Sequence, residues 1–503
     1  MKTLPLISTG ALLIALCSAG SSNIGAHRQM FRFHYENVIG TSLDLKIVAP
    51  SEARAGQAEN AALNEIDREA KILSGYDASS EFSRWFRTSG TAVPVSSDLF
   101  EVLSTFDKWR EKTNGALDPA AEAITRVWKR AAAENRMPQP SELSAAVASV
   151  QQRHWQLDAA HRTATHLTGT PLVLNSFAKS YIVSRAADAA LASPEIGGVV
   201  VNIGGDLVVR GDLTEPVDVA DPFSDAENSD PIASLMVHDR AIATSGDYRR
   251  GVEIGGKHYS HIVDPRTGQP AGDIVSSTVL AANASDAGAL ATAFSVLKPE
   301  ESARIAARTP GVAYLLVKKN GEQVANPAWL AMAVRHPHTS LYPAAAAGAW
   351  DASMELEISF ELARIDNFRA RRPYVAVWIE DADKFPVRTI ALWVEKPRYI
   401  PEMKAWYRDD RIRNMAEGAE ITRSISSATR PPGKYTVKWD GKDNAGKLVK
   451  AGKYTVLIEA TREHGTDQTI RQEFDFNGAP KQVTLAGGVE IAGAALNYRK
   501  AGR

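Results

Sequence analysis

Residues 197–212 are GGVVVNIGGDLVVRGD. Two apolar runs, residues 199–203 and 207–209, lie on either side of Gly204 and Gly205. Both runs are rich in valine, and β-branched residues favour strands, whereas a glycine pair supplies the backbone conformations of a tight turn. The stretch therefore predicts two strands joined by a turn.

Helical patterns lie on both sides of this stretch. In residues 59–73, ENAALNEIDREAKIL, apolar residues recur at helical spacing, and Ser74 and Gly75 end the pattern. Residues 284–297, ASDAGALATAFSVL, repeat the same spacing. Helical and strand patterns alternate from residue 32 to residue 297, which predicts an α+β domain.

The overall composition is that of a globular protein. The chain has 503 residues, of which 44% are hydrophobic and 23% charged. This length predicts about two to four domains. A net charge of -1 gives no indication of a nucleic-acid partner.

The first 26 residues have the features of an export signal. Lys2 precedes an apolar run from Leu4 to Leu16, which is shorter than the ~20 residues that a bilayer requires. Cleavage is expected near Ala19 or Ala26, and it would remove Cys17, the only cysteine. We therefore expect an exported, periplasmic protein without disulfides or a reactive thiol, associated with a membrane only through a partner.

A change of composition predicts a domain boundary. Residues 336–350 combine prolines, small residues and four consecutive alanines, which is typical of a linker between domains at 27–335 and 351–503. After it, MELEISF at 354–360 alternates apolar and polar residues as a half-buried strand does. The motif GKYTV occurs at 433–437 and again at 452–456, which predicts an antiparallel hairpin in an all-β, immunoglobulin-like sandwich.

One polar loop carries a histidine. Residues 259–270, YSHIVDPRTGQP, hold His261, Asp264 and two prolines without helical or strand periodicity. Taken alone, His261 fits a loop residue hydrogen-bonded to its neighbours better than a catalytic group. The surrounding motifs change this interpretation.

Eight short motifs occur in a characteristic order. They are VIGTSL, LSGYDASSEFSR, TNGALDPAAEAI, FAKSY, NIGGD, IATSGDYRR, DPRTG and ALATAF. In this order and spacing they resemble the ApbE-type FAD:protein FMN transferases, from about residue 33 to residue 317. The resemblance implies that FAD is split with the help of Mg²⁺, that FMN is placed on a threonine or serine of a target protein, and that AMP is released. It also implies a flavin-accepting partner that is an exported or membrane protein.

The residue types suit this chemistry. Splitting a pyrophosphate requires charge neutralisation and positioning more than covalent chemistry, and Mg²⁺ binds oxygen ligands. Glycine turns allow the backbone to approach phosphates. A rigid loop can hold His261 within hydrogen-bond reach of the transferring phosphate.

The resemblance also assigns site residues. The catalytic group comprises His261, Asp264 and Thr292. The flavin-binding group comprises Ile39, Tyr76, Ala116, Leu117, Asp118, Val173, Lys179, Gly204, Gly205, Ser245 and Ile262. The metal group comprises the Ser176 carbonyl, Ser285, Asp286, Thr292 and position 288. Core packing is the alternative role for Tyr76 and Ile262, and helix capping is the alternative for Asp118.

The chain departs from the family pattern at several of these positions. The family's metal-binding aspartate is Gly288 here, an aspartate six residues before Lys179 is Val173, and the glycine after Lys179 is Ser180. Asp286 as helix N-cap, or Ser285 on the face of Thr292, could replace the lost ligand, although capping alone is the simpler role for Asp286. We therefore expect weakened metal binding. A flavin-binding protein with lost or weakened catalysis and an FAD pyrophosphatase are the alternative functions, and the C-terminal domain is expected to bind proteins.

Overall fold

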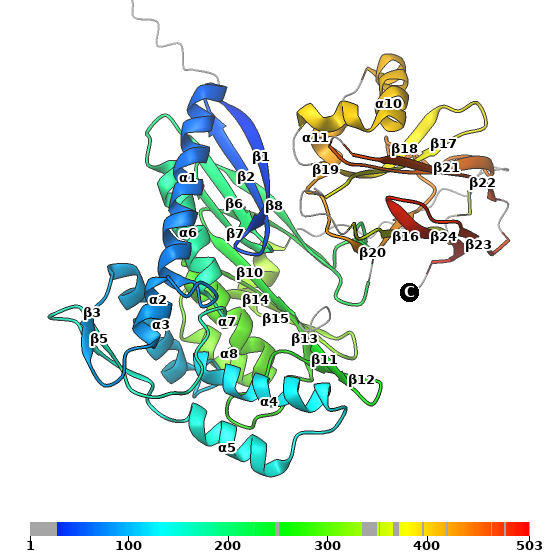
Figure 1. Cartoon of the computed structure of the whole chain (residues 1–503). Coiled ribbons are helices and arrows are strands. Elements are labelled where there is room, and N and C mark those ends of the chain that lie inside the picture. Colours follow the sequence, from blue (N-terminus) through cyan, green and yellow to red (C-terminus); the bar gives the residue numbers. More distant parts are fainter. Residues whose placement is uncertain are drawn as a thin grey trace, which may run out of the picture.

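A computed structural model describes residues 28–224, 226–246, 251–333, 350–351, 353–365, 372–394, 397–418, 421–463, 465–476 and 479–501 (Figure 1). The expected signal peptide, linker residues 336–349 and residues 247–250 of the IATSGDYRR motif lie outside this part. In the described part, no helix has the length and apolar character of a membrane span.

The first half of the chain is built on one antiparallel sheet. Its eight strands follow the order β1-β2-β6-β7-β10-β13-β14-β15. Their bounds are β1 Gln29–Val38, β2 Thr41–Ala49, β6 Gly198–Ile203, β7 Asp206–Gly211, β10 Ala241–Gly246, β13 Ile274–Ala281, β14 Ala313–Lys318 and β15 Gln323–Ala325. The hairpin expected at 197–212 is β6 and β7, joined by a turn in which Gly204 and Gly205 have φ of 56° and 94°.

Both faces of this sheet are covered at its centre, which explains why almost every residue of β6, β13 and β14 is buried. Val199 and Val201 join the core beneath the helices, whereas Val200 on the opposite face packs into a second apolar cluster. The helices are α1 Glu52–Leu73, α6 Ala178–Leu191 and α7 Ala284–Val296. The opposite cover is β8 Thr214–Val219, β9 Ala233–His238 and α9 Pro327–Met332.

Smaller elements surround this framework. The helices are α2 Glu81–Phe86, α3 Ser97–Lys112, η1 Pro119–Ala121, α4 Glu122–Ala133, α5 Pro140–Val150 and α8 Pro299–Ala307. A three-stranded sheet contains β3 Ala92–Pro94, β5 Thr163–His166 and β4 Trp155–Asp158, and a hairpin contains β11 Gly251–Ile254 and β12 Lys257–Ser260. Both predicted helices are confirmed, since α1 ends at Leu73 and α7 covers 284–296.

The C-terminal region is a two-sheet sandwich. One sheet has the order β20-β16-β24-β23 and the other β19-β18-β17-β21-β22. The bounds are β16 Met354–Leu362, β17 Tyr374–Glu380, β18 Pro386–Trp393, β19 Ser426–Ser427, β20 Gly433–Trp439, β21 Gly452–Thr461, β22 Asp467–Phe476, β23 Lys481–Leu485 and β24 Ile491–Lys500. The mostly β character is as predicted. Three helices of this region were not predicted: η2 Pro397–Glu402, α10 Lys404–Glu417 and α11 Thr422–Ile425.

The expected hairpin between the two GKYTV motifs is wrong. The first motif lies in β20, which pairs with β16, and the second lies in β21, which pairs with β17 and β22 in the other sheet. The connection at 440–451 therefore crosses between the sheets. Each motif shows only that a strand has one buried face, and this condition holds equally for strands facing each other across a core.

A buried carboxyl pair beneath α10 predicts a pH effect on stability. Burial first, and then the neighbouring Asp409, raise the pKa of Glu380 from 4.5 to about 7, although Arg471 lies 3.5 Å away and Trp378 donates a hydrogen bond to Glu380. The folded chain thus keeps a proton that the unfolded chain releases above pH 4.5. This stabilising contribution is complete below that pH and is lost as the pH rises through about 7.

We expect Glu380→Gln to flatten the pH dependence of the free energy of unfolding, because glutamine keeps the shape of the side chain without titrating. Urea unfolding at about pH 5.5 and about pH 8.5 measures it. Glu473→Gln on β22, which is exposed beside Lys453, is the matched control. If the free energy of unfolding changed by the same amount between the two pH values in wild type and in Glu380→Gln, the raised pKa of Glu380 would be contradicted.

Candidate functional site

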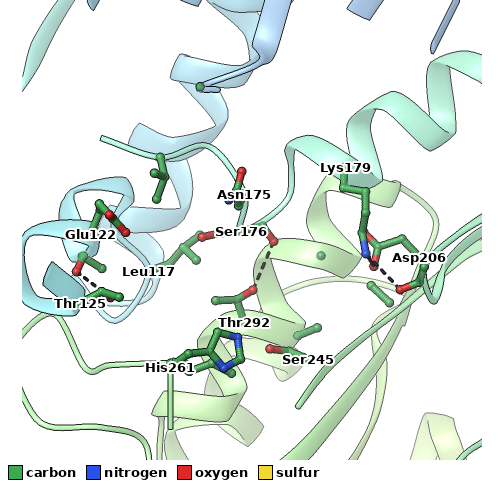
Figure 2. A pocket seen from close by; sticks show the side chains of 18 of the residues that line it. Leu117, Glu122, Thr125, Asn175, Ser176, Lys179, Asp206, Ser245, His261 and Thr292 are labelled. Atoms are coloured by element: carbon green, nitrogen blue, oxygen red, sulfur yellow. Dashed lines mark hydrogen bonds and ion pairs between the residues drawn. The ribbon is translucent and has the colours of Figure 1, made fainter. Parts of the chain in front are cut away.

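A cavity of about 1500 Å³ lies between the sheet and the helices of the first half (Figure 2). Its walls come from the β6–β7 turn, the ends of β8 and β10, the loop at 261–265, α4, the start of α6 and one face of α7. Segments far apart in the sequence thus meet around one space. The volume exceeds that of typical small-molecule sites and suits a dinucleotide.

The structure brings most of the predicted site residues to this cavity. Those lining it are Tyr76, Ala116, Leu117, Asp118, Val173, Ser176, Lys179, Gly204, Gly205, Ser245, His261, Ile262, Gly288 and Thr292. Ile39, Asp264, Ser285 and Asp286 are not among the lining residues. Tyr76 is 86% exposed, so the alternative of core packing does not hold for it.

Ser176 and Thr292 form a pair of adjacent oxygens. Thr292, on α7, donates a hydrogen bond from Oγ1 to the Ser176 carbonyl at 3.2 Å (Figure 2). Two neighbouring ligands of an octahedral Mg²⁺ lie about 3 Å apart, so this spacing suits one cation. Both oxygens are neutral, and no group of three or more acidic, histidine or cysteine side chains arranged for a metal occurs in the described part of the chain. The pair therefore fits a weakly held cation only.

Ser180 occupies the space beside Gly288. A Cβ atom added to Gly288 would lie 2.2 Å from Ser180 Oγ, 3.1 Å from the Ser180 Cβ and 3.2 Å from the Phe177 Cβ, so a side chain there requires the Ser180 hydroxyl to move and α6 to shift slightly away from α7. The Ser180 hydroxyl also donates a hydrogen bond to Asp206 Oδ2 at 2.7 Å. The two departures from the family pattern, at 180 and 288, are thus sterically complementary.

Asp206 is a cavity carboxylate that the sequence analysis missed. It follows the glycine turn on β7, and Lys179 Nζ lies 3.4 Å from its Oδ1 and donates to the Gly204 carbonyl at 3.1 Å (Figure 2). Burial raises the pKa of Asp206, and the Lys179 charge acts against that shift. The aspartate of the NIGGD motif was the available signal. The result is one fixed ammonium group at the cavity wall.

The loop that carries His261 owes its rigidity to Asp264. Asp264 accepts hydrogen bonds from the Arg266 backbone and guanidinium, each at 2.9 Å, and its backbone N–H bonds to Gln269. Trp128 donates to the Gly268 carbonyl at 2.9 Å. These contacts give Asp264 a structural role, because it fixes the turn that positions His261, and its catalytic role stays a prediction.

Asp118 both caps a helix and faces the cavity. Its side chain accepts from the Ala120 N–H at 2.8 Å and lies 2.7 Å from Arg110 Nε. Burial raises the pKa of Asp118 to about 6, against the opposing effect of Arg110. The capping alternative is thus correct, and a flavin-binding role remains a prediction.

The remaining predicted site residues, Asp286, Ser285 and Ile39, are not part of the cavity lining. The N-cap of α7 is Asn283, and Asp286 accepts hydrogen bonds from Lys108 at 2.9 Å and Trp109 at 2.7 Å, which corrects its expected capping role and leaves its carboxylate engaged. Ser285 is buried in the first turn of α7. Ile39 lies in the β1–β2 turn with φ of 41°, and Thr41 lines the cavity in its place.

Two further contributors were not predicted. Asn175 donates to the Tyr76 hydroxyl at 2.9 Å, which positions this exposed ring at the rim. On α4, one face lines the cavity with Glu122, Thr125, Arg126 and Lys129. The helix begins after η1, within the TNGALDPAAEAI motif, but its polar residues are common on any solvated helix and gave no signal.

The fold and site define a protein with a dinucleotide-sized, partly cationic cavity at the strand ends of an antiparallel α+β domain. The model of the ApbE family matches residues 39–316, and the model of a predicted periplasmic protein family, DUF2271, matches 355–493. The first match covers more than half of the chain. The chain therefore belongs to the ApbE family.

Individual relatives agree with this assignment. The FAD:protein FMN transferase of Treponema pallidum is 28% identical over 332 residues, covering 61% of this chain and 90% of the relative. That of Vibrio cholerae is 30% identical over 293 residues, covering 56% and 85%. The ApbE protein of Thermotoga maritima has a TM-score of 0.53 at 26% identity, covering 60% of this chain and 99% of that structure. The Pseudomonas stutzeri flavinyl transferase ApbE, with a TM-score of 0.50 at 24% identity over 61% and 97%, supports the fold.

Proposed function

We propose that this protein is an exported FAD:protein FMN transferase that places FMN on a threonine or serine of a periplasmic or membrane-bound partner. The observation that carries the proposal is the single cavity that joins Tyr76, Lys179, His261 and Thr292. Relatives that match most of their length are named for this activity. The expected signal peptide and the periplasmic label of the second family favour export.

In the proposed reaction the acceptor hydroxyl oxygen attacks the phosphorus on the FMN side of FAD. A phosphoester bond forms, the bond from that phosphorus to the bridging oxygen breaks, and AMP leaves with the bridging oxygen. His261, held by its rigid loop at the cavity wall, accepts the hydroxyl proton. Transfer of this kind depends mainly on positioning and electrostatics.

The other residues bind and orient the dinucleotide. Lys179 offers an ammonium group to the phosphates, and the glycine turn lets the backbone approach them. Tyr76, supported by Asn175, offers a ring for stacking on the flavin or adenine. A bound Mg²⁺ would contact the Ser176 carbonyl and Thr292 Oγ1 and would neutralise phosphate charge.

The test incubates purified protein with FAD, Mg²⁺ and a co-expressed candidate acceptor, followed by in-gel flavin fluorescence and mass spectrometry of the acceptor. We expect a fluorescent acceptor band and a mass increase equal to FMN, with AMP released. The control is a family member that has the metal-binding aspartate at the position of Gly288. If that relative transfers flavin to the acceptor and this protein does not, the proposal is contradicted.

The second candidate function is flavin binding with weak or absent turnover. The neutral donor pair at Ser176 and Thr292, without a carboxylate at position 288, favours it, because Mg²⁺ affinity depends on ligand charge. Hydrolysis of FAD to FMN and AMP without an acceptor is the third outcome. Product analysis without an acceptor separates the three: no products, FMN plus AMP, or products only when an acceptor is present.

A further inference from the structure

The hairpin β8–β9 connects the cavity to the C-terminal sandwich. Val217, Asp218, Val219 and Ala220 line the cavity, and the chain then leaves the wall at residue 221 and returns at 232. We call residues 221–232 the arm. Its described residues are folded on themselves, because Asp221 accepts from Phe223 at 2.9 Å and Ser229 donates its N–H to Ala226 at 3.2 Å.

The arm pairs with the edge strand of the sandwich. Ala226 forms a parallel bridge with Thr436 of β20, and the Glu227 N–H donates to the Thr436 carbonyl at 2.8 Å. The Asn228 amide continues the pairing: its Nδ2 donates to the Lys438 carbonyl and its Oδ1 accepts the Lys438 N–H, both at 2.7 Å. A side-chain amide thus takes the place of a strand residue in the ladder.

An ion pair adds to this contact. Arg430, whose guanidinium lies 5.0 Å from the Trp393 ring centroid, approaches Glu227 Oε2 at 3.4 Å. Both side chains are largely buried, at 26% and 19% exposed. Backbone pairing at a sheet edge with a charge partner beside it is the pattern by which extended peptides bind to sheet edges.

We infer that the C-terminal sandwich braces the arm and thereby positions the β8 wall of the flavin cavity, with Asn228 as the principal positioning residue. This inference rests on the proposed function only in taking FAD as the ligand. Described residues of the C-terminal sandwich contribute nothing to the cavity lining, so its effect on flavin binding must pass through the arm. If the arm served only to cover the exposed edge of β20, breaking this contact would leave the affinity for FAD unchanged.

The test compares full-length wild type with Asn228→Ala. We expect faster deuterium exchange in peptides covering residues 221–232, and a Kd and KM for FAD raised about 5- to 10-fold, the lower range of couplings between sites, with kcat little changed. Asn320→Ala, in the β14–β15 turn where its side chain accepts the Glu322 N–H, is the control and should change neither quantity.

A disulfide supplies the rescue. Ala226 and Thr436 are bridge partners, and the spacing of paired strands suits a disulfide. The rescue variant therefore combines Ala226→Cys and Thr436→Cys with Asn228→Ala. It also carries Cys17→Ser, because Cys17 is the only native cysteine. Oxidation should restore wild-type FAD affinity and reduction should remove it. Unchanged exchange, or faster exchange with unchanged FAD affinity, overturns the inference. Failure of the wild type to bind FAD overturns the proposed function instead, and exchange and cross-linking would still report the contact.

Discussion

Ser180→Gly combined with Gly288→Asp is expected to create a tight metal site, whereas Gly288→Asp alone is expected to damage the fold. In the single variant the new Cβ at position 288 would lie 2.2 Å from Ser180 Oγ, which real structures do not tolerate. Overpacking of this kind costs about 1–3 kcal/mol or more. Removing the Ser180 side chain frees that volume, so a carboxylate can project from the helix turn that also carries Thr292.

The measurement is Mn²⁺ binding by electron paramagnetic resonance, with thermal unfolding as the measure of folding. We expect the double variant to bind Mn²⁺ about 10- to 100-fold more tightly than the wild type. Residues that only support a metal ligand already change metal affinity by this factor. The rate of flavin transfer should rise together with the affinity for the metal ion. Ser180→Gly alone is the control, since it loses the hydrogen bond to Asp206 without gaining a ligand. A stable single Gly288→Asp variant with tight metal binding would contradict the steric account.

His261→Asn is expected to lower turnover about 10²- to 10⁴-fold, the range for removal of a general base, while FAD affinity changes little. The asparagine keeps the polarity of the position within a loop whose turn is fixed by the hydrogen bonds between Asp264 and Arg266. If native turnover is too slow to measure, the comparison is made in the double variant described above.

Single-turnover flavin transfer and an FAD titration together separate the two effects. His258→Asn, exposed on the neighbouring strand β12, is the matched control and should retain full activity. Equal turnover for wild type and His261→Asn would remove His261 from the proposed mechanism.

Local pattern predicted the elements well and their pairing less well. The hairpin at 197–212 and helix α7 followed from apolar spacing and from a glycine pair that needs positive φ. The two GKYTV strands were predicted correctly as strands but paired wrongly, because sequence periodicity shows that a face is buried and not which sheet covers it.

The candidate site shows the same contrast between local features, which the sequence predicted, and contacts in space, which it did not. Most of the site residues that the motifs predicted line the cavity, since each motif brings its own turn or helix start to the strand ends. The NIGGD motif could have pointed to Asp206 as a candidate, but its contact with Ser180 and the fit of Ser180 beside Gly288 could not be predicted, because they depend on α6, α7 and β7 meeting within a few ångströms in space. The structural role of Asp264 was not predicted, because an aspartate that organises a turn and one that performs chemistry look alike in sequence.

The most direct test of the flavin cavity is a fluorescence titration of FAD into the purified protein, with Mg²⁺ and with a chelator. We expect saturable binding of one FAD per chain under both conditions, with only a small gain in affinity from Mg²⁺, because Lys179 and the glycine turn hold the phosphates and the metal donors are neutral. Absence of saturable binding under both conditions would show that the cavity does not bind FAD.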